Sequence, residues 1–358
     1  MNQETKLTLH PLLMRVLTAL LMLQLAGCSV GYYWQAARGQ MRIVNGREDI
    51  DVLLEDASVQ PELRARLELS AAALDFAHGE LQLPDNGSYR SYYDTGSDYV
   101  VWNVFAAPEF SLEPLNWCFP VAGCVSYRGY FAVDKARKYA AKLAAKGNDI
   151  YVAGVPAYST LGRFEDPVLN TMLEMSDEQF AGLLFHELAH QRLYAQDDTA
   201  FNEGFAEAVE QIGLTRWRPA AVIAAEDKYR QQLETVVELL KETREQLESL
   251  YVENQVAAEM RTAKAAIISA ATNEYRLLVV EWQLAGLGYR PYEHMMKHGL
   301  NNASLSALAT YANYLPAFMA IYSDCQEVMP CFYGRAEELA GLDLAERREQ
   351  LAALMSTP

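Results

Sequence analysis

Two histidines and a glutamate at helical spacing are the residues of this chain best suited to chemistry. They lie in the segment Phe185-His186-Glu187-Leu188-Ala189-His190. Residues four apart on an α-helix differ by about 40° in rotation and about 6 Å in rise, so His186 and His190 would share one face and could share one metal ion. Glu187 would lie at the edge of that face, where it could take a proton from a metal-bound water without being a ligand. The segment therefore predicts metal-assisted hydrolysis with Glu187 as the general base.

A catalytic zinc ion also needs a third protein ligand and one open position for water. Glu203, in the segment Asn202-Glu203-Gly204-Phe205-Ala206, follows His190 after twelve intervening residues. That interval leaves room for a turn at 196–198 and for a second helix that packs beside the first. We therefore expect one Zn²⁺ ion, held by His186, His190 and Glu203. The alternative for Glu203 is a helix-start carboxylate that complements the macrodipole.

Glu207 lies one helical turn after Glu203 and would share its face. We expect its carboxylate to accept the second ring N–H of a liganding histidine, which fixes the tautomer and the orientation of the ring. A solvated position for Glu207 is the alternative. In that case Glu210 could hold the histidine, or it could bind a substrate amine.

Two helices must position these residues. Ser176 and Gln179 form the capping-box pattern, which predicts the start of the first helix. Asp198 or Thr199 is expected to start the second helix.

The rest of the chain predicts an α+β, mostly helical fold. Residues 28–175 mix helices and strands, with helices expected at 50–54, 61–76 and 135–146 and strands at 99–105 and 149–152. From 176 onward the pattern is helical: metal-binding helices at 176–215, a long antiparallel hairpin at 219–285 that turns near Glu253-Asn254, and C-terminal helices at 286–358, with blocks at 303–323 and 334–355. A heptad coiled coil is the alternative for the hairpin, but its repeat is not strict enough. We expect residues 28–358 to be a single unit.

The first 27 residues have the order of a secretory signal. Lys6 and Arg15 precede an apolar run at 16–25, which is too short to span a bilayer as a helix. Leu25-Ala26-Gly27-Cys28 resembles the lipobox of bacterial lipoproteins, which are cut before the cysteine and lipidated on it. Ser29 resembles outer-membrane sorting, so we expect a lipid anchor on Cys28 and an outer-membrane protein that faces the periplasm. The alternative is a buried N-terminal helix with an incidental cysteine.

Four further cysteines favour disulfides, because an exported chain with an even count commonly pairs them. They form two pairs with five intervening residues each, Cys118 with Cys124 and Cys325 with Cys331. This pairing is the simplest, although two other connectivities are allowed. A four-cysteine zinc site is the rival interpretation, but it usually has closer spacing.

The composition excludes some partners. The chain has 358 residues and a net charge of −17, with 51% hydrophobic residues. A chain this acidic is a poor nucleic-acid binder, because phosphate contacts need cationic side chains. Its net charge also gives no attraction to anionic lipid headgroups.

The two metal-binding motifs resemble those of the gluzincin metallopeptidases, above all the zinc aminopeptidases, whose third ligand is the glutamate of an Asn-Glu-Gly-Phe-Ala motif. With the lipobox and the paired cysteines, the chain resembles a bacterial family of lipoprotein aminopeptidases from about Cys28 to its C-terminus. The interval from His190 to Glu203 is shorter than in the better-known gluzincins. A Gly-x-Met-Glu-Asn segment, which recognises a free amino terminus in the largest aminopeptidase family, does not occur in the sequence.

The resemblance implies a gluzincin-like fold and a peptide substrate. Gluzincins commonly stabilise the tetrahedral oxyanion with a tyrosine or histidine from a later segment, and Tyr311 and Tyr314 are the candidates here. The alternative is that both are partly buried helix aromatics.

We therefore expect a zinc metallopeptidase that acts on peptide amino termini. One alternative is a membrane-anchored amide hydrolase or endopeptidase that acts on cell-wall or envelope peptides. Another is a non-catalytic, lipid-anchored binding protein. Glu187 argues against the last alternative, because a structural zinc site fills all four positions with protein ligands and has no use for a general base.

Overall fold

The computed structural model describes residues 31–119, 123–217, 222–253, 256–309 and 314–355, without the side chains of 222–229, 298 and 309. The predicted signal segment and Cys28 lie outside these residues. The chain divides into two units, which are described separately. Residues 31–46 of the first unit form one helix. No helix among the described residues has both the length and the apolar character needed to cross a membrane.

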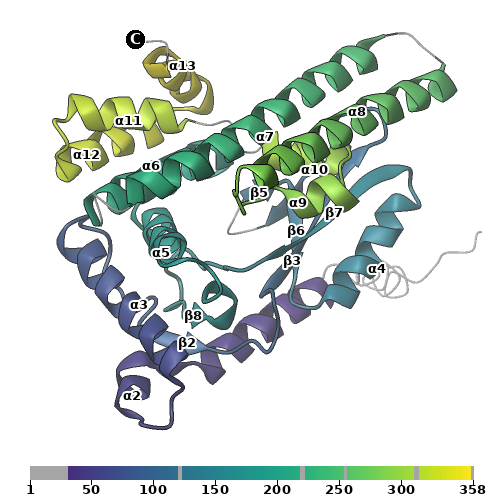
Figure 1. Cartoon of the computed structure of the whole chain (residues 1–358). Coiled ribbons are helices and arrows are strands. Elements are labelled where there is room, and N and C mark those ends of the chain that lie inside the picture. The colour runs from purple at the N-terminus through teal and green to yellow at the C-terminus, as the bar shows by residue number, and fades with distance from the viewer. Residues whose placement is uncertain (1–30, 120–122, 218–221, 254–255, 310–313, 356–358) are drawn as a thin grey trace, which may run out of the picture. The chain divides into compact units, whose positions relative to one another are not determined.

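The unit from Arg47 onward is helix-rich with small sheets, which confirms the predicted α+β, mostly helical class (Figure 1). Its strands are β1 (Glu48–Asp49), β2 (Ser91–Tyr93), β3 (Val101–Pro108), β4 (Trp117–Phe119), β5 (Gly123–Val125), β6 (Tyr127–Tyr130), β7 (Asn148–Val155) and β8 (Val168–Leu169). Its helices up to the pair that carries His186, His190 and Glu203 are α2 (Ile50–Glu55), α3 (Pro61–Gly79), α4 (Val133–Ala144), the short 3-10 helix η1 (Asn170–Met172), α5 (Asp177–Arg192) and α6 (Thr199–Trp217). The later helices are α7 (Val222–Val252), α8 (Ala257–Leu284), α9 (Glu293–His298), α10 (Asn302–Ala309), α11 (Leu315–Asp324), α12 (Met329–Ala340) and α13 (Leu344–Met355).

The main sheet has the strand order β6-β3-β7, with both outer strands antiparallel to β3. Val104 lies at its centre, opposite Arg128 on one side and Val152 on the other, and it is fully buried. Helices α4 and α10 both contact β3 and β7. Two smaller sheets accompany it, with the orders β1-β2-β8 and β4-β5.

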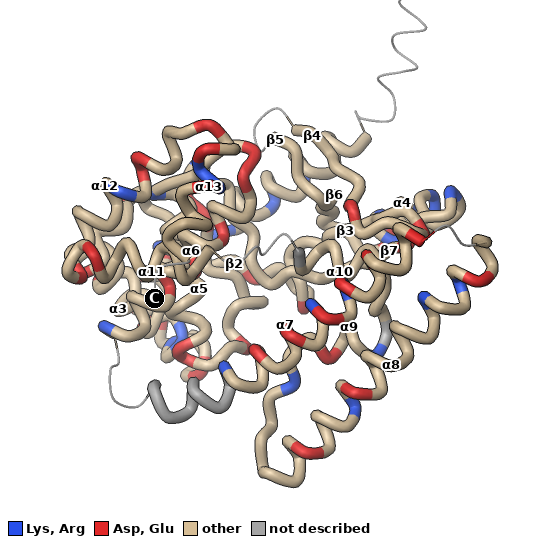
Figure 2. Tube along the Cα trace, turned by 90° about the horizontal axis from the view of Figure 1, so that it is seen from above, with Lys and Arg blue, Asp and Glu red and all other residues tan. Residues whose placement is uncertain are grey.

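The predicted helical hairpin is confirmed as α7 and α8, which lie along each other as two long antiparallel helices (Figure 1). Buried residues such as Leu240 and Leu247 of α7 and Tyr275 and Trp282 of α8 belong to one apolar cluster. Acidic and basic residues both occur along the described parts of the two helices (Figure 2). The hairpin is therefore held by its apolar sides and solvated by mixed charges.

The C-terminal blocks are more divided than the sequence predicted. The expected block at 303–323 consists of α10 and α11, and α11 has Pro316 in its first turn. The expected block at 334–355 begins earlier, at Met329, and breaks after Ala340 into α12 and α13. Proline lacks an N–H and fits the first helical turn, so Pro316 begins a new helix where hydrophobic periodicity alone predicted a continuous one.

A buried ion pair joins the start of α6 to α13. Arg347 Nη1 lies 2.8 Å from Asp198 Oδ2, and their side chains are only 7% and 1% exposed. The Asp198 carboxylate also accepts the Phe201 N–H at 3.3 Å and so caps α6, whose first residue is Thr199; the sequence had left both residues open as the start of this helix. The start of α6, the helix that carries Glu203, is thus fixed by the C-terminal helix α13.

Replacing Arg347 should therefore destabilise the fold strongly. We expect Arg347→Met to lower the free energy of unfolding by about 3–5 kcal/mol, because it leaves the Asp198 carboxylate buried without its partner. Urea unfolding followed by circular dichroism measures this change. Arg335→Met is the matched control, since Arg335 and Asp324 form an exposed pair 3.6 Å apart, where a loss below about 1 kcal/mol is expected. Equal losses in the two variants would contradict the importance of the buried pair.

Both disulfides have the simplest connectivity, Cys118–Cys124 and Cys325–Cys331, so that prediction is confirmed. The first disulfide joins β4 to β5, and the second joins the end of α11 to α12. The four-cysteine zinc site is excluded, because every one of these sulfur atoms is bonded to its partner.

Candidate metal centre

Helix α5 presents both histidines from one face. Its start is the predicted capping box: the Ser176 hydroxyl accepts the Gln179 N–H at 3.2 Å, and the Gln179 side chain accepts the Ser176 N–H at 3.1 Å. The rings of His186 and His190 have centroids 4.8 Å apart and are nearly perpendicular at 84°. The sequence spacing therefore places two imidazoles side by side, as predicted.

Asn202 fixes the connection between α5 and α6. Its side chain accepts the Ala195 N–H at 2.7 Å and donates to the Ala195 carbonyl at 2.8 Å, and Asn202 is 1% exposed. One amide side chain thus satisfies both backbone groups of a residue in the turn. As a result, the turn that precedes Glu203 is held against the first turn of α6.

Glu203 closes a three-residue group with the two histidines. Its Oε2 lies 3.4 Å from His186 Nε2, and its Oε1 lies 3.7 Å from His190 Nε2. All three potential ligand atoms lie within 4.8 Å of one another. Zinc bound tetrahedrally at about 2.0–2.2 Å places its ligand atoms about 3.4 Å apart, so this nitrogen, nitrogen and oxygen set fits a single ion. The group predicted from the sequence can therefore hold a metal.

The two histidines have opposite protonation tendencies. Burial and the neighbouring charge of His186 lower the pKa of His190 to about 4, so its ring is neutral and its lone pair is available. Burial also opposes charge on His186, but hydrogen bonds to Glu203 and Glu210 raise its pKa well above the ordinary value. The same bond to His186 lowers the pKa of Glu203 despite burial. The hydrogen bond between His186 and Glu203 therefore favours the charged form of both side chains.

The second nitrogen of His186 is held by Glu210, whose Oε2 lies 3.1 Å from Nδ1. From the sequence we expected Glu207 to form this bond, with Glu210 as the alternative. The structure has the alternative. Glu210 can come close because it packs against Gly182, where an added Cβ would lie 2.9 Å from Glu210 Oε1. Glu207 lies near the same histidine, and burial raises the pKa of its carboxyl to about 7.

Nδ1 of His190 is buried and has no hydrogen-bond partner among the described residues.

Glu187 lies in an environment that suits a general base. Burial, together with the nearby carboxylates of Glu203 and Asp166, raises its pKa to about 7, although the charge of His186 opposes the rise. Asp166 is 2% exposed and accepts the Thr160 N–H at 2.8 Å, which fixes the segment that follows β7 beside Glu187. Nothing in the sequence around Asp166 indicates this position, because a single aspartate in a loop carries no motif.

Tyr127, the first residue of β6, is a second residue near the site that was not predicted from the sequence. Burial of its hydroxyl, with Glu203, Tyr194 and Glu187 as charged or polar neighbours, raises the pKa of Tyr127 above its ordinary value. The residue as a whole is still 36% exposed, so it borders the accessible side of the site. A protonated phenol therefore lies close to both the third potential ligand and the candidate base. The chain has 21 tyrosines, and Tyr127 precedes the histidines by about sixty residues, so no local signal distinguished it.

Of the two tyrosines proposed from the sequence, Tyr311 lies outside the described residues. Tyr314 caps α11 and packs against Gly204, where an added Cβ would meet Tyr314 Cβ at 2.9 Å and its backbone at 3.3 Å. This close approach explains the glycine that follows Glu203. The backbone of Tyr314 is therefore near α6, whereas its role as an oxyanion donor stays a prediction.

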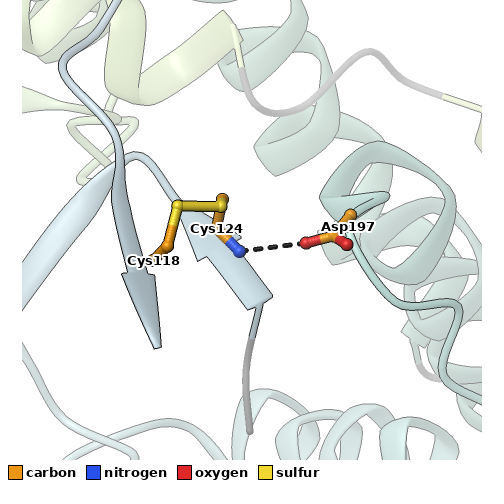
Figure 3. Close-up of a disulfide and its surroundings, with 3 residues drawn as sticks. All are labelled: Cys118, Cys124 and Asp197. Carbon is orange, nitrogen blue, oxygen red and sulfur yellow. Dashed lines mark hydrogen bonds between the residues drawn. A yellow bond between two sulfur atoms is a disulfide. The ribbon is translucent and has the colours of Figure 1, made fainter. Parts of the chain in front are cut away.

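The disulfide hairpin β4–β5 touches the same connection between α5 and α6. The Asp197 carboxylate accepts the Cys124 N–H at 2.9 Å (Figure 3). Gly123 beside it has φ +71, and an added Cβ would lie only 2.2 Å from Asp197 Oδ1, so no other residue fits there without a shift. The connection between α5 and α6 is thus hydrogen-bonded to Asn202 at Ala195 and to the β4–β5 hairpin at Asp197.

Comparison with known proteins gives one match. A family model with the description "Putative aminopeptidase" matches residues 31–351. No curated protein and no solved structure matches the chain. The matched range includes His186, His190 and Glu203.

Proposed function

The chain belongs to the "Putative aminopeptidase" family, and from this premise we propose that it hydrolyses peptide bonds at peptide amino termini with one zinc ion held by His186, His190 and Glu203. The observation that carries the proposal is the convergence of these three ligand atoms within 4.8 Å, beside the carboxylate of Glu187. The resemblance of both motifs to those of gluzincins supports the same reaction. Two histidines and one carboxylate, with a position left for solvent, are typical of catalytic zinc.

Zinc at this site would supply a Lewis acid that acidifies water and polarises the scissile carbonyl group. The protein's part is to move protons and to orient groups. Glu187 takes a proton from the attacking water and returns it to the leaving amine. Its pKa of about 7 without a metal would fall beside a cation, so the carboxylate is ionised at neutral pH and can accept that proton. Glu210 keeps the His186 ring oriented, with Nε2 toward Glu203.

Tyr127 is the proposed donor to the tetrahedral oxyanion. Its high pKa keeps the phenol protonated, which a donor to an oxyanion requires. The charges of Glu203 and Glu187 both act on its hydroxyl, which supports a position near the metal ligands and the base. Tyr314 is the second candidate, because it is adjacent to Gly204.

Replacing Tyr127 by phenylalanine should slow the chemical step. We expect kcat to fall about 10²- to 10³-fold, the usual effect of losing one oxyanion donor, with little change in KM. Steady-state kinetics on a fluorogenic amino-terminal substrate measure both constants. Tyr130→Phe is the control, since Tyr130 lies three positions along the same strand and points to the opposite face. A normal kcat for Tyr127→Phe, with a reduced kcat for Tyr314→Phe, would transfer the role to Tyr314.

A peptide-library digest read by mass spectrometry tests the proposed reaction. The protein is compared after chelator treatment and after zinc is added back, on peptides with free amino termini and on the same peptides with acetylated termini. We expect zinc-dependent loss of amino-terminal residues from the free peptides only. Equal cleavage of both sets at internal bonds would support the endopeptidase or amide-hydrolase alternative instead. Absence of zinc-dependent cleavage from every peptide would reject the proposed function and leave the non-catalytic binding protein.

Attachment to a bacterial membrane through Cys28 is a further part of the proposal. It is supported by the Leu25-Ala26-Gly27-Cys28 segment and by the basic and apolar residues before it. Mass spectrometry of the protein from bacterial membranes would detect acyl chains on Cys28. If the protein from these membranes carries Cys28 without any acyl chain, the proposed lipid anchor is wrong.

A further inference from the structure

The helix at 31–46 is cationic, unlike the chain as a whole. Residues 5–47 contain no aspartate or glutamate, although the chain has 47 acidic residues in total. Within the helix, Arg38 and Arg42 are the charged residues. The net charge of −17 therefore does not describe this segment, which is locally cationic.

Aromatic and apolar side chains share one exposed side of this helix. At 100° per residue, Tyr33, Ala37, Met41 and Trp34 fall within an arc of about 100°. The three large side chains of this arc are well exposed, at 45% for Tyr33, 69% for Trp34 and 47% for Met41. A single exposed aromatic residue is ordinary on a protein surface, but three large apolar residues on one helical arc form a patch.

The two arginines border that patch. Arg38 and Arg42 follow Trp34 at one and two further helical turns, which places them about 40° and 80° beyond it around the helix. Both are exposed, and neither forms an ion pair with any residue that the structure describes. Their guanidinium groups are therefore free to bind anions at the edge of an apolar surface.

We propose that residues 31–46 lie on a lipid surface that contains anionic headgroups. Tryptophan and tyrosine favour the headgroup level of a bilayer, because their rings are apolar and their N–H and O–H groups are polar. Arginines at the edge of an apolar helix side bind headgroup phosphates while their stems cover the apolar boundary. Tyr33, Trp34 and Met41 enter the interface, and Arg38 and Arg42 bind the phosphates. The proposal rests neither on the peptidase reaction nor on acylation of Cys28.

Quenching of Trp34 fluorescence by brominated lipids tests this placement. The full chain is reconstituted into phosphatidylcholine vesicles with or without phosphatidylglycerol, with bromine atoms near the headgroup end of the acyl chains. The contribution of Trp34 is the difference between the unaltered chain and Trp34→Phe. We expect strong quenching of that contribution in the anionic vesicles, weakened by added salt. An unquenched Trp34 contribution would overturn the proposal.

A membrane attachment near Trp34 could bring it close to the brominated lipids even if the helix did not bind them. Variants of the two arginines distinguish these cases, because only binding by the helix depends on Arg38 and Arg42. In anionic vesicles, Arg38→Gln/Arg42→Gln should lower the ratio of docked to undocked helix by about 25-fold, or about fivefold for each arginine. The matched control is Arg137→Gln/Lys138→Gln, which removes two exposed cations from α4 and should change nothing. Equal quenching in the Arg38→Gln/Arg42→Gln chain and the unaltered chain would contradict the proposal. A Trp34 emission that shifts with protein concentration in the absence of vesicles would also contradict it and would indicate a second copy of the chain.

Discussion

Glu187→Gln is expected to lower kcat by about 10²- to 10⁴-fold while the metal content stays normal. Glutamine has nearly the same size as glutamate but cannot accept the proton of the attacking water at neutral pH. The burial that raises the pKa of Glu187 to about 7 also excludes bulk water, so no solvent base replaces the lost carboxylate. The metal should remain bound, because its ligands are His186, His190 and Glu203.

Two measurements separate this role from a structural one. Metal content is determined on the purified variant by mass spectrometry, and kcat is determined on the same sample. Glu178→Gln is a suitable control, since Glu178 is a partly buried acid in the first turn of the same helix, about two and a half turns before Glu187. Activity of Glu187→Gln within a few-fold of the unaltered protein would remove Glu187 as the base. Loss of metal together with activity would make it a ligand or a determinant of the fold.

Glu203→Ala is expected to lose the metal. Glu207→Ala and Glu210→Ala, which change the two following acids on the same side of α6, should keep it. Removal of Glu203 leaves only two of the three protein ligands and takes away the only negatively charged one, which is too few to hold zinc tightly. Glu210→Ala should weaken metal binding by about 10- to 100-fold, the usual effect of losing the hydrogen bond behind a liganding histidine. Glu207→Ala should have the smallest effect.

Titration of zinc into the metal-free variants, with a chromophoric chelator as competitor, gives these three affinities. The expected order of affinity loss is Glu203 first, then Glu210, then Glu207. Circular dichroism of each metal-free variant checks that the fold persists. Normal zinc affinity in Glu203→Ala would show that another residue supplies the third ligand, and it would reject the proposed site.

Features determined by neighbouring residues were predictable from the sequence. The capping box at Ser176, the cap at Asp198 and the spacing of His186 and His190 depend on helix geometry alone, and the structure has all of them. The disulfides followed from the pairing of nearby cysteines. Glu203 was predicted from the need for a third ligand and from its place near the start of the second helix, and the resemblance to a known family supported the same residue.

Features determined by packing between distant segments were not predictable. Glu203, Glu207 and Glu210 share one side of α6, and which of the last two reaches His186 depends on how closely α5 and α6 approach at Gly182. Tyr127 and Asp166 reach the site from a sheet and a loop, and no sequence period relates them to the histidines.

The short connection between α5 and α6 has a consequence for how such proteins can diverge. It is bonded at Ala195 by Asn202, at Asp197 by the β4–β5 hairpin and at Asp198 by Arg347, so its backbone cannot bulge or shorten without breaking one of these bonds. A single inserted residue would turn the following acid by about 100° away from the imidazoles. In homologous sequences, insertions and deletions should therefore accumulate elsewhere, and the distance in sequence between the second histidine and the third ligand should stay constant.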